Sequence, residues 1–161
     1  MGKKICDVLA GIFLLFLAAL AAILILPKCF GCNSLAVLSG SMEPAIPVGA
    51  IVFVKETEPE ALQVGDVITY QMESGTKVTH RITEILEDNQ AVRTKGDANE
   101  VEDGNVVSYA DILGKMLFQV PYLGYISIYG KTPQGVLIAC GVLIFLILLL
   151  FLPEVLKKEP L

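Results

Sequence analysis

Two long uncharged runs, one toward each end of the chain, constrain the fold more than any other feature of the sequence. Residues 8–26 and residues 135–152 contain no charged side chain. They are about 19 and about 18 residues long, and 18 helical residues reach roughly 27 Å, which is enough to cross the hydrocarbon core of a bilayer. We therefore predict an N-terminal and a C-terminal transmembrane helix.

A cleaved signal peptide is the alternative interpretation of the first run. The apolar core of a signal peptide is usually about 7–15 residues long and is followed by a small-residue cleavage site. Here the small residues Ala19 and Ala21 lie inside the run, and apolar residues continue as far as Pro27. This pattern favours an uncleaved anchor.

Basic residues flank the outer ends of both runs and predict the orientation of the chain. Lysine pairs stand at positions 3–4 and 157–158. Cytoplasmic flanks of membrane helices are enriched in lysine and arginine. We therefore expect residues 1–7 and 153–161 to be cytoplasmic and residues 27–134 to form an extracytoplasmic domain.

The segment between the two runs has the pattern of a small β domain. Short stretches rich in β-branched residues alternate with turn residues, and Asp88-Asn89 is typical of a hairpin turn. The predicted strands are residues 50–55, 64–70, 77–85, 91–95, 106–109 and 114–120. Closely spaced short strands favour a mostly antiparallel sheet. The predicted fold class is therefore mostly β, with a transmembrane helix on each side.

Charge and cysteine content exclude several functions. The formal net charge is -5, whereas binding to nucleic acid requires a basic face. No zinc-type cluster of Cys and His is present, so the sequence gives no indication of a zinc site. Cys29 and Cys32 form a C-x-x-C. A thioredoxin-like motif would need a βαβ context that is missing here, so a local disulfide or two free thiols near the membrane surface is favoured. A membrane thiol oxidoreductase stays an alternative.

Three segments of the predicted β domain carry residues that could perform chemistry. Ser41 lies in Ser39-Gly-Ser-Met-Glu-Pro, a loop between apolar segments. His80 is the only histidine, and an imidazole can activate a serine hydroxyl because it titrates near neutral pH. On strict alternation His80 shares a strand face with Val78 and Ile82, where it would need a polar partner.

The third segment is acidic. Residues 94–103 read Thr-Lys-Gly-Asp-Ala-Asn-Glu-Val-Glu-Asp, with carboxylates at Asp97, Glu100, Glu102 and Asp103. A carboxylate that bonds the imidazole would fix its tautomer. At most one or two of the four can face His80, and the others are expected to be solvated.

These three segments, in this order, resemble the type I signal peptidases, in particular the endoplasmic-reticulum type that is also found in archaea and some Gram-positive bacteria. The resemblance extends over the anchor, the three segments and the C-terminal run. It implies a serine endopeptidase that removes signal peptides from secretory preproteins after small residues in an Ala-x-Ala pattern. The implied partners are these preproteins and the lipid bilayer, and the resemblance leaves accessory subunits open.

The resemblance also implies a role for each site residue. Ser41 would be the nucleophile and His80 the general base. The Ser41 backbone N–H and the Ser39 hydroxyl would form the oxyanion hole, and Met42 would support the loop. Asp103 would orient the base, with Asp97 as a second required acid.

Two further alternatives stay open at this point. The ordinary bacterial type of the family uses a lysine base, and Lys77 and Lys95 are the lysines near His80 in the sequence. A second alternative, from another functional class, is a membrane-anchored β binding module in which Ser41 is only a turn residue. Whichever of these interpretations holds, the hydrophobic stretch at residues 116–128 could rest on the membrane surface or belong to ordinary core strands.

Overall fold

The computed structural model describes residues 2–130 and 132–155. The predicted cytoplasmic tail at residues 153–161 extends beyond this part of the chain, and the lysine pair at 157–158 lies outside it. The chain divides into two compact units. One is Pro27–Ser127, and the other combines residues 1–26 with residues 128–161.

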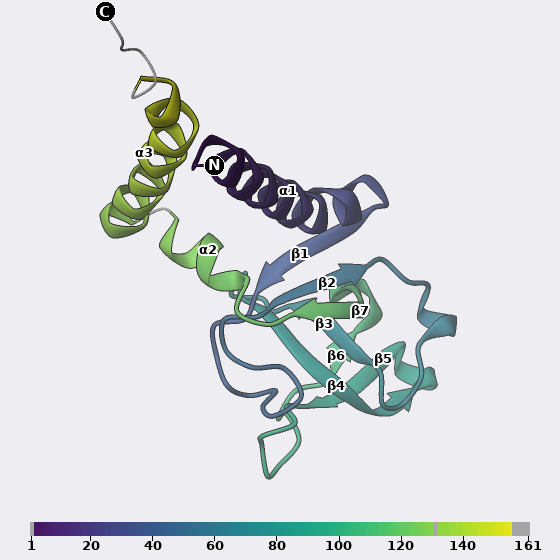
Figure 1. Ribbon diagram of the computed structural model, residues 1–161. Helices are drawn as coiled ribbons and strands as arrows, with labels where there is room; N and C mark the ends of the chain where they lie inside the picture. Colours follow the sequence, from purple (N-terminus) through teal and green to yellow (C-terminus); the bar gives the residue numbers. More distant parts are fainter. Residues whose placement is uncertain (1, 131, 156–161) are drawn as a thin grey trace, which may run out of the picture. The chain divides into compact units, whose positions relative to one another are not determined.

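The Pro27–Ser127 unit is built on one seven-stranded sheet in which every neighbouring pair of strands is antiparallel (Figure 1). The strands are β1 (Cys32–Ala36), β2 (Ile51–Lys55), β3 (Val67–Gln71), β4 (Lys77–Leu86), β5 (Ala91–Lys95), β6 (Val107–Ser108) and β7 (Ile112–Val120). Their order across the sheet is β1-β2-β7-β3-β4-β5-β6. The prediction of a mostly antiparallel β domain is confirmed.

All six predicted strands are present, with ends that differ by up to three residues. The predicted hairpin turn is a short 3-10 helix, η2 (Glu87–Asn89), and two others are η1 (Pro59–Ala61) and η3 (Tyr109–Asp111). Strand β1 was not predicted, because Cys-Asn-Ser-Leu-Ala contains no β-branched residue. It forms through its pairing with β2, in which Ser34 lies opposite Phe53.

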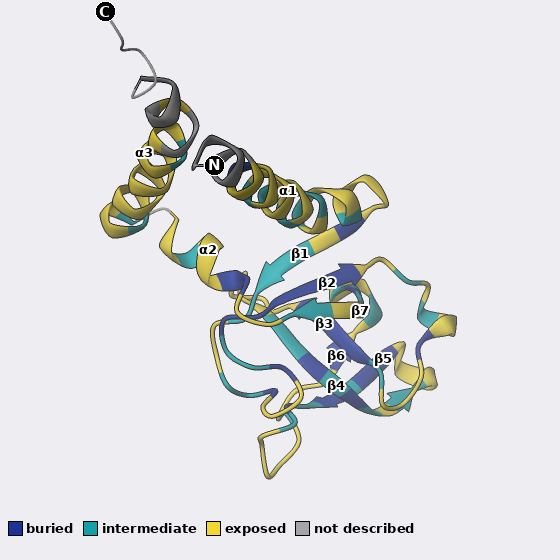
Figure 2. Cartoon of the chain, in the orientation of Figure 1, coloured by how far each residue is buried: buried dark blue, intermediate teal, exposed yellow. Residues whose placement is uncertain are grey.

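Two clusters of buried side chains stabilise the sheet, and Figure 2 shows the buried strands around them. The first cluster contains Leu62, Ile68, Tyr70, Ile82, Val92 and Val107. The second contains Met42, Ile46, Ala50, Val52 and Val67. Strand β3 contributes to both clusters because successive side chains point to opposite faces. The second cluster also fixes the loop that carries Ser41.

Three α-helices complete the described chain: α1 (Gly2–Cys29), α2 (Gly124–Tyr129) and α3 (Pro133–Val155). Most apolar side chains of α1 that the structure describes are exposed, for example Leu15 at 72% (Figure 2). Among the described helices one stretch, Val8–Cys29, is long and apolar enough to cross a membrane, and the apolar stretch Pro133–Leu148 of α3 is shorter. The N-terminal apolar helix is therefore confirmed, and the C-terminal span remains a prediction.

Candidate active site

The loop between β1 and β2 carries Ser41 and is closed at its base by main-chain hydrogen bonds. The Val37 N–H donates to the Ala50 carbonyl at 2.9 Å, and the Gly49 N–H donates to the Val37 carbonyl at 2.9 Å. Inside the loop, the Ile46 N–H donates to the Met42 carbonyl at 2.8 Å. Ser41 therefore lies on a turn whose conformation the backbone itself defines.

Side chains tie the same loop to the sheet. Met42 and Ile46 are 2% and 1% exposed and belong to the second core cluster. Gln119 of β7 donates from Nε2 to the Ala45 carbonyl at 2.5 Å. The predicted supporting position of Met42 fits this packing, because a buried side chain next to Ser41 limits how far the serine can move.

His80 lies on β4 and is buried, with 7% of its surface exposed. Ile82 is also buried and Val78 is half-buried, so the predicted apolar face of this strand is confirmed. The polar partner that such a position requires is Asp103, whose Oδ2 lies 2.6 Å from His80 Nδ1. An ionised carboxylate can only accept, so Nδ1 carries the hydrogen and a neutral imidazole has its free lone pair at Nε2.

Asp103 is itself held by side chains that sequence reasoning did not identify. Thr94 Oγ1 donates to Asp103 Oδ2 at 2.6 Å, and the Tyr70 hydroxyl donates to the same oxygen at 3.3 Å. The Asp103 N–H donates to the Thr94 carbonyl at 2.9 Å. Burial raises the pKa of Tyr70, which keeps its hydroxyl protonated as a donor. Thr94 opens the acidic segment and could have been suspected, whereas nothing in the sequence singles out Tyr70.

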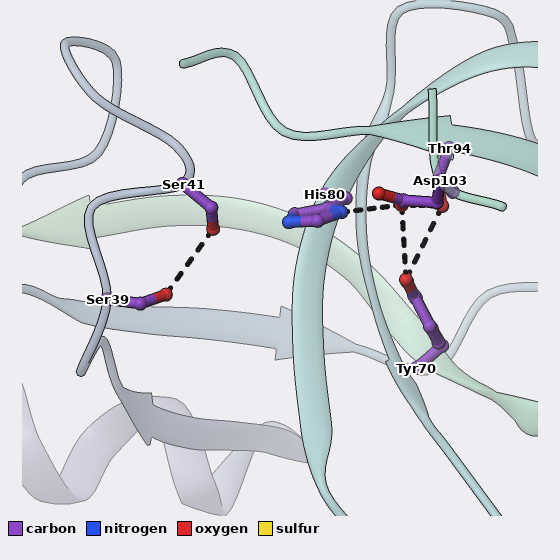
Figure 3. Close-up of polar contacts among 6 residues, drawn as sticks. All are labelled: Ser39, Ser41, Tyr70, His80, Thr94 and Asp103. Atoms are coloured by element: carbon purple, nitrogen blue, oxygen red, sulfur yellow. Dashed lines mark hydrogen bonds and ion pairs between the residues drawn. The ribbon is translucent and has the colours of Figure 1, made fainter. Parts of the chain in front are cut away.

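Figure 3 shows Ser41 and Asp103 on opposite sides of the imidazole, with the second ring nitrogen of His80 turned toward Ser41. Among the described residues, the hydrogen-bond partner of the Ser41 hydroxyl is the Ser39 hydroxyl, with the two oxygens 3.4 Å apart. The order hydroxyl, imidazole, carboxylate is the one that proton transfer from a serine to a histidine requires.

Asp97 occupies a different place from Asp103. Its carboxylate accepts two hydrogen bonds from Arg81, at 2.8 Å from Nε and at 2.6 Å from Nη2. Arg81 also donates from Nη1 to the Gly65 carbonyl at 2.8 Å. The hydrogen bonds with Arg81 lower the pKa of Asp97, and those with Asp97 raise the pKa of Arg81. Of the two acids, the structure therefore pairs Asp103 with the imidazole and Asp97 with the arginine that follows it.

The acidic segment also contacts the backbone of Ser41. The Ala98 N–H donates to the Ser41 carbonyl at 2.9 Å. A Cβ atom added to Gly96 would lie 2.5 Å from that carbonyl oxygen, so a side chain at position 96 would push the two segments apart. Glycine is thus required here for close approach. Glu100 and Glu102 are exposed, as predicted for the acids that do not face His80.

The Arg81–Asp97 pair is expected to make stability depend on pH in the acid range. The pKa of Asp97 is lower in the folded protein than in the unfolded chain. The contribution of Asp97 to the free energy of unfolding is therefore complete above about pH 4 and is lost as the pH falls further. Asp97→Asn should cost about 1–3 kcal/mol at pH 7 and flatten the loss of stability below pH 4. Urea unfolding followed by circular dichroism at several pH values measures both effects. An unchanged pH dependence would contradict this assignment.

Metal-ligating side chains and the two thiols of the C-x-x-C were the other candidates for a functional site. Within residues 2–130 and 132–155, no three His, Cys, Asp or Glu side chains lie close enough to share a metal ion. Cys29 ends α1 and Cys32 begins β1, and both are free thiols. This order of helix and then strand is not the strand, turn and helix that surround a thioredoxin-like C-x-x-C.

A serine on a fixed loop, facing a histidine that is bonded to a carboxylate, is the arrangement that defines the serine hydrolases. Comparison with known proteins narrows this class. The chain is 42% identical over 99 residues to signal peptidase I W of Bacillus subtilis (strain 168), which covers 59% of this chain and 52% of that protein. It is 30% identical over 125 residues to the human signal peptidase complex catalytic subunit SEC11C, which covers 68% of this chain and 65% of the relative.

A third relative is the signal peptidase complex catalytic subunit SEC11 of Ogataea parapolymorpha, 35% identical over 113 residues, with 57% of this chain and 64% of that protein covered. No protein-family model matches the chain. The matches span from about half to just under two thirds of the length of these relatives. The chain is a homologue of signal peptidases, of the group that contains signal peptidase I W and the SEC11 subunits.

Proposed function

We propose that this chain is a membrane-anchored serine endopeptidase that removes N-terminal signal peptides from secretory preproteins, with Ser41 as nucleophile and His80 as general base. The observation that carries the proposal is the 2.6 Å contact between His80 Nδ1 and Asp103, which leaves the other ring nitrogen directed toward Ser41 (Figure 3). The homology to signal peptidases supports the choice of substrate. A binding module would not require this arrangement.

In the proposed mechanism, Ser41 Oγ attacks the carbonyl carbon of the residue before the cleavage point while His80 Nε2 takes the hydroxyl proton. The resulting imidazolium is stabilised by the Asp103 carboxylate. It then gives the proton to the leaving amine as the peptide bond breaks. Water, activated by the same imidazole, attacks the acyl-enzyme, and the new carboxylate leaves with Ser41 Oγ reprotonated.

The negative charge of the tetrahedral intermediate falls on the former carbonyl oxygen. The Ser41 N–H and the Ser39 hydroxyl are the donors proposed to stabilise it, and the Ser39 oxygen lies 3.4 Å from the nucleophile. Loss of one such donor typically lowers the rate by about 10²-fold to 10³-fold. In this mechanism the two donors act together with the side chains of Ser41 and His80, and the reaction needs no metal or organic cofactor.

Asp103→Asn is expected to lower kcat by about 10⁴-fold, because an amide at this position favours the wrong tautomer of His80. The measurement is the rate of cleavage of a purified preprotein by the full chain in detergent. Glu102→Gln is the matched control, since it removes the adjacent, exposed carboxylate and should leave the rate unchanged. Full activity of Asp103→Asn would transfer the orienting role to Asp97.

The anchor is proposed to confine enzyme and substrate to one membrane surface, which raises their effective concentration. Both predicted helices would span the bilayer, with the termini cytoplasmic and residues 27–134 on the other side. This stretch belongs in part to the core, since Phe118 stacks on the buried Phe53 and Leu123 is buried. Its exposed side chains, Leu117, Tyr122 and Ile126, are proposed to contact the membrane surface. The orientation is tested with Ser74→Cys, whose thiol should be labelled from the outside in intact cells. Labelling only after permeabilisation would invert the predicted orientation.

Accessory subunits are further candidate partners. Two of the relatives are named as catalytic subunits of a signal peptidase complex. The name of signal peptidase I W does not refer to a complex. Activity of the purified chain alone would show that the active site is complete without other subunits, and activity only in a membrane extract would favour a complex.

A further inference from the structure

A groove of about 870 Å³ begins at His80 and Asp103 and extends away along the end of β3 and its hairpin with β4. Its walls come from residues 70–74, from Val78 and His80 of β4, from residues 103–107 and from Asp111. Ser41 is not among the residues that line it. His80 therefore faces Ser41 on one side and borders the groove on the side of Asp103 (Figure 3).

The chemistry of the proposed reaction decides which part of a substrate passes the imidazole. His80 must give its proton to the leaving amine, so the residue after the cleavage point lies within hydrogen-bond reach of the ring. The chain beyond that residue leaves the active site beside His80. An extended peptide advances about 3.4 Å per residue, so the groove would receive roughly the second to fifth residues after the cleavage point.

The charge of the groove is one-sided. The charged residues that line it besides His80 are Glu73, Asp103 and Asp111, and all three are acidic. Asp103 is bonded to His80, whereas Glu73 and Asp111 are exposed and form no ion pair with any residue that the structure describes. Two unpaired carboxylates at the wall of a peptide groove attract lysine or arginine and repel aspartate or glutamate.

We infer that this groove binds the segment of the preprotein that follows the cleavage site and that it favours a basic residue there. The inference rests on the proposed function. Exposed charge pairs each contribute little, so the expected preference is about threefold to tenfold in kcat/KM rather than absolute. It would be weakened by salt, because exposed charges are screened.

The test uses the full chain in detergent and a series of preprotein substrates that carry lysine, glutamine or glutamate in turn at each of the first five positions after the cleavage point. At one or two positions kcat/KM should fall in the order lysine, glutamine, glutamate. The double variant Glu73→Gln, Asp111→Asn should lose this order. The matched control, Glu87→Gln with Asp88→Asn, removes the same charges from η2, which does not line the groove, and should keep it.

The outcomes distinguish a failure of the groove inference from a failure of the proposed function. Equal kcat/KM for the three residues at every position in the unmodified chain would overturn the inference and leave the proposed function intact. A preference that survives in the groove variant, or is lost equally in the η2 control, would also overturn it. No cleavage of any substrate would overturn the proposed function and the inference together.

Discussion

Replacing Ser41 by alanine is expected to lower kcat/KM for preprotein cleavage by about 10⁴-fold to 10⁶-fold while leaving the fold intact. The variant removes the atom that attacks the carbonyl, and the hydrolysis that remains depends on the oxyanion donors and on substrate binding. The loop should keep its conformation, because Met42 and Ile46 remain buried and the Ser41 backbone keeps its hydrogen bond from Ala98.

The matched control for this experiment is Ser34→Ala. Ser34 lies on β1, opposite Phe53 of β2, and contributes nothing to the proposed reaction. The Ser34→Ala variant should cleave the preprotein at the rate of the unmodified chain. Circular dichroism and a urea unfolding curve of each variant verify that the domain is folded. Equal activity of Ser41→Ala and the unmodified chain would exclude Ser41 as the nucleophile. No cleavage of a competent substrate by the unmodified chain would leave the binding module as the better interpretation.

His80→Ala should reduce kcat by a similar factor, about 10⁶-fold, because nucleophile and base act as one unit and the loss of either removes most of their joint effect. The double variant with Ser41→Ala should therefore be hardly slower than either single variant. Initial rates over a range of preprotein concentrations give kcat and KM separately. KM should change little, since His80 acts on the reacting atoms.

Lys77→Ala is the informative comparison for His80. Lys77 begins the same strand and is exposed, and it is one of the two lysines that could act as an alternative base. Its removal should change kcat by less than about twofold, in the range of a surface substitution. A severe loss in Lys77→Ala together with an active His80→Ala would favour a serine–lysine pair instead.

Alternation along β4 allowed much of the site to be predicted from the sequence. Because His80 lies two residues from both Val78 and Ile82, its burial followed from the geometry of a strand alone. The need of a buried imidazole for a polar partner pointed to a serine. The acidic segment was considered because a carboxylate would fix the tautomer of the imidazole, and the structure gives Asp103 as the bonded partner. Ser41 was identified by its loop and by the family resemblance.

The contacts that distinguish Asp103 from Asp97 could not be predicted in this way. Both carboxylates lie in one irregular segment, where no periodicity tells which side chain faces the sheet. Their partners are fixed by the pairing of β4 with β5, which places Arg81 opposite Lys95 and brings the start of the acidic segment beside β4. Tyr70 is two strands away from Thr94 and joins the same carboxylate only through the order of the sheet.

The hydrogen bond from Ala98 to the Ser41 carbonyl has a consequence for the newly synthesised protein. Ser41 leaves the ribosome well before His80, and Asp103 follows last. Until β4, β5 and the acidic segment have joined the sheet, the serine has neither its base nor the hydrogen bond that the Ala98 N–H donates to its carbonyl. Such pairing between distant segments is slow to form. Under the proposed mechanism, a growing chain therefore cannot cut its own anchor helix or that of a neighbour before these segments have joined the sheet.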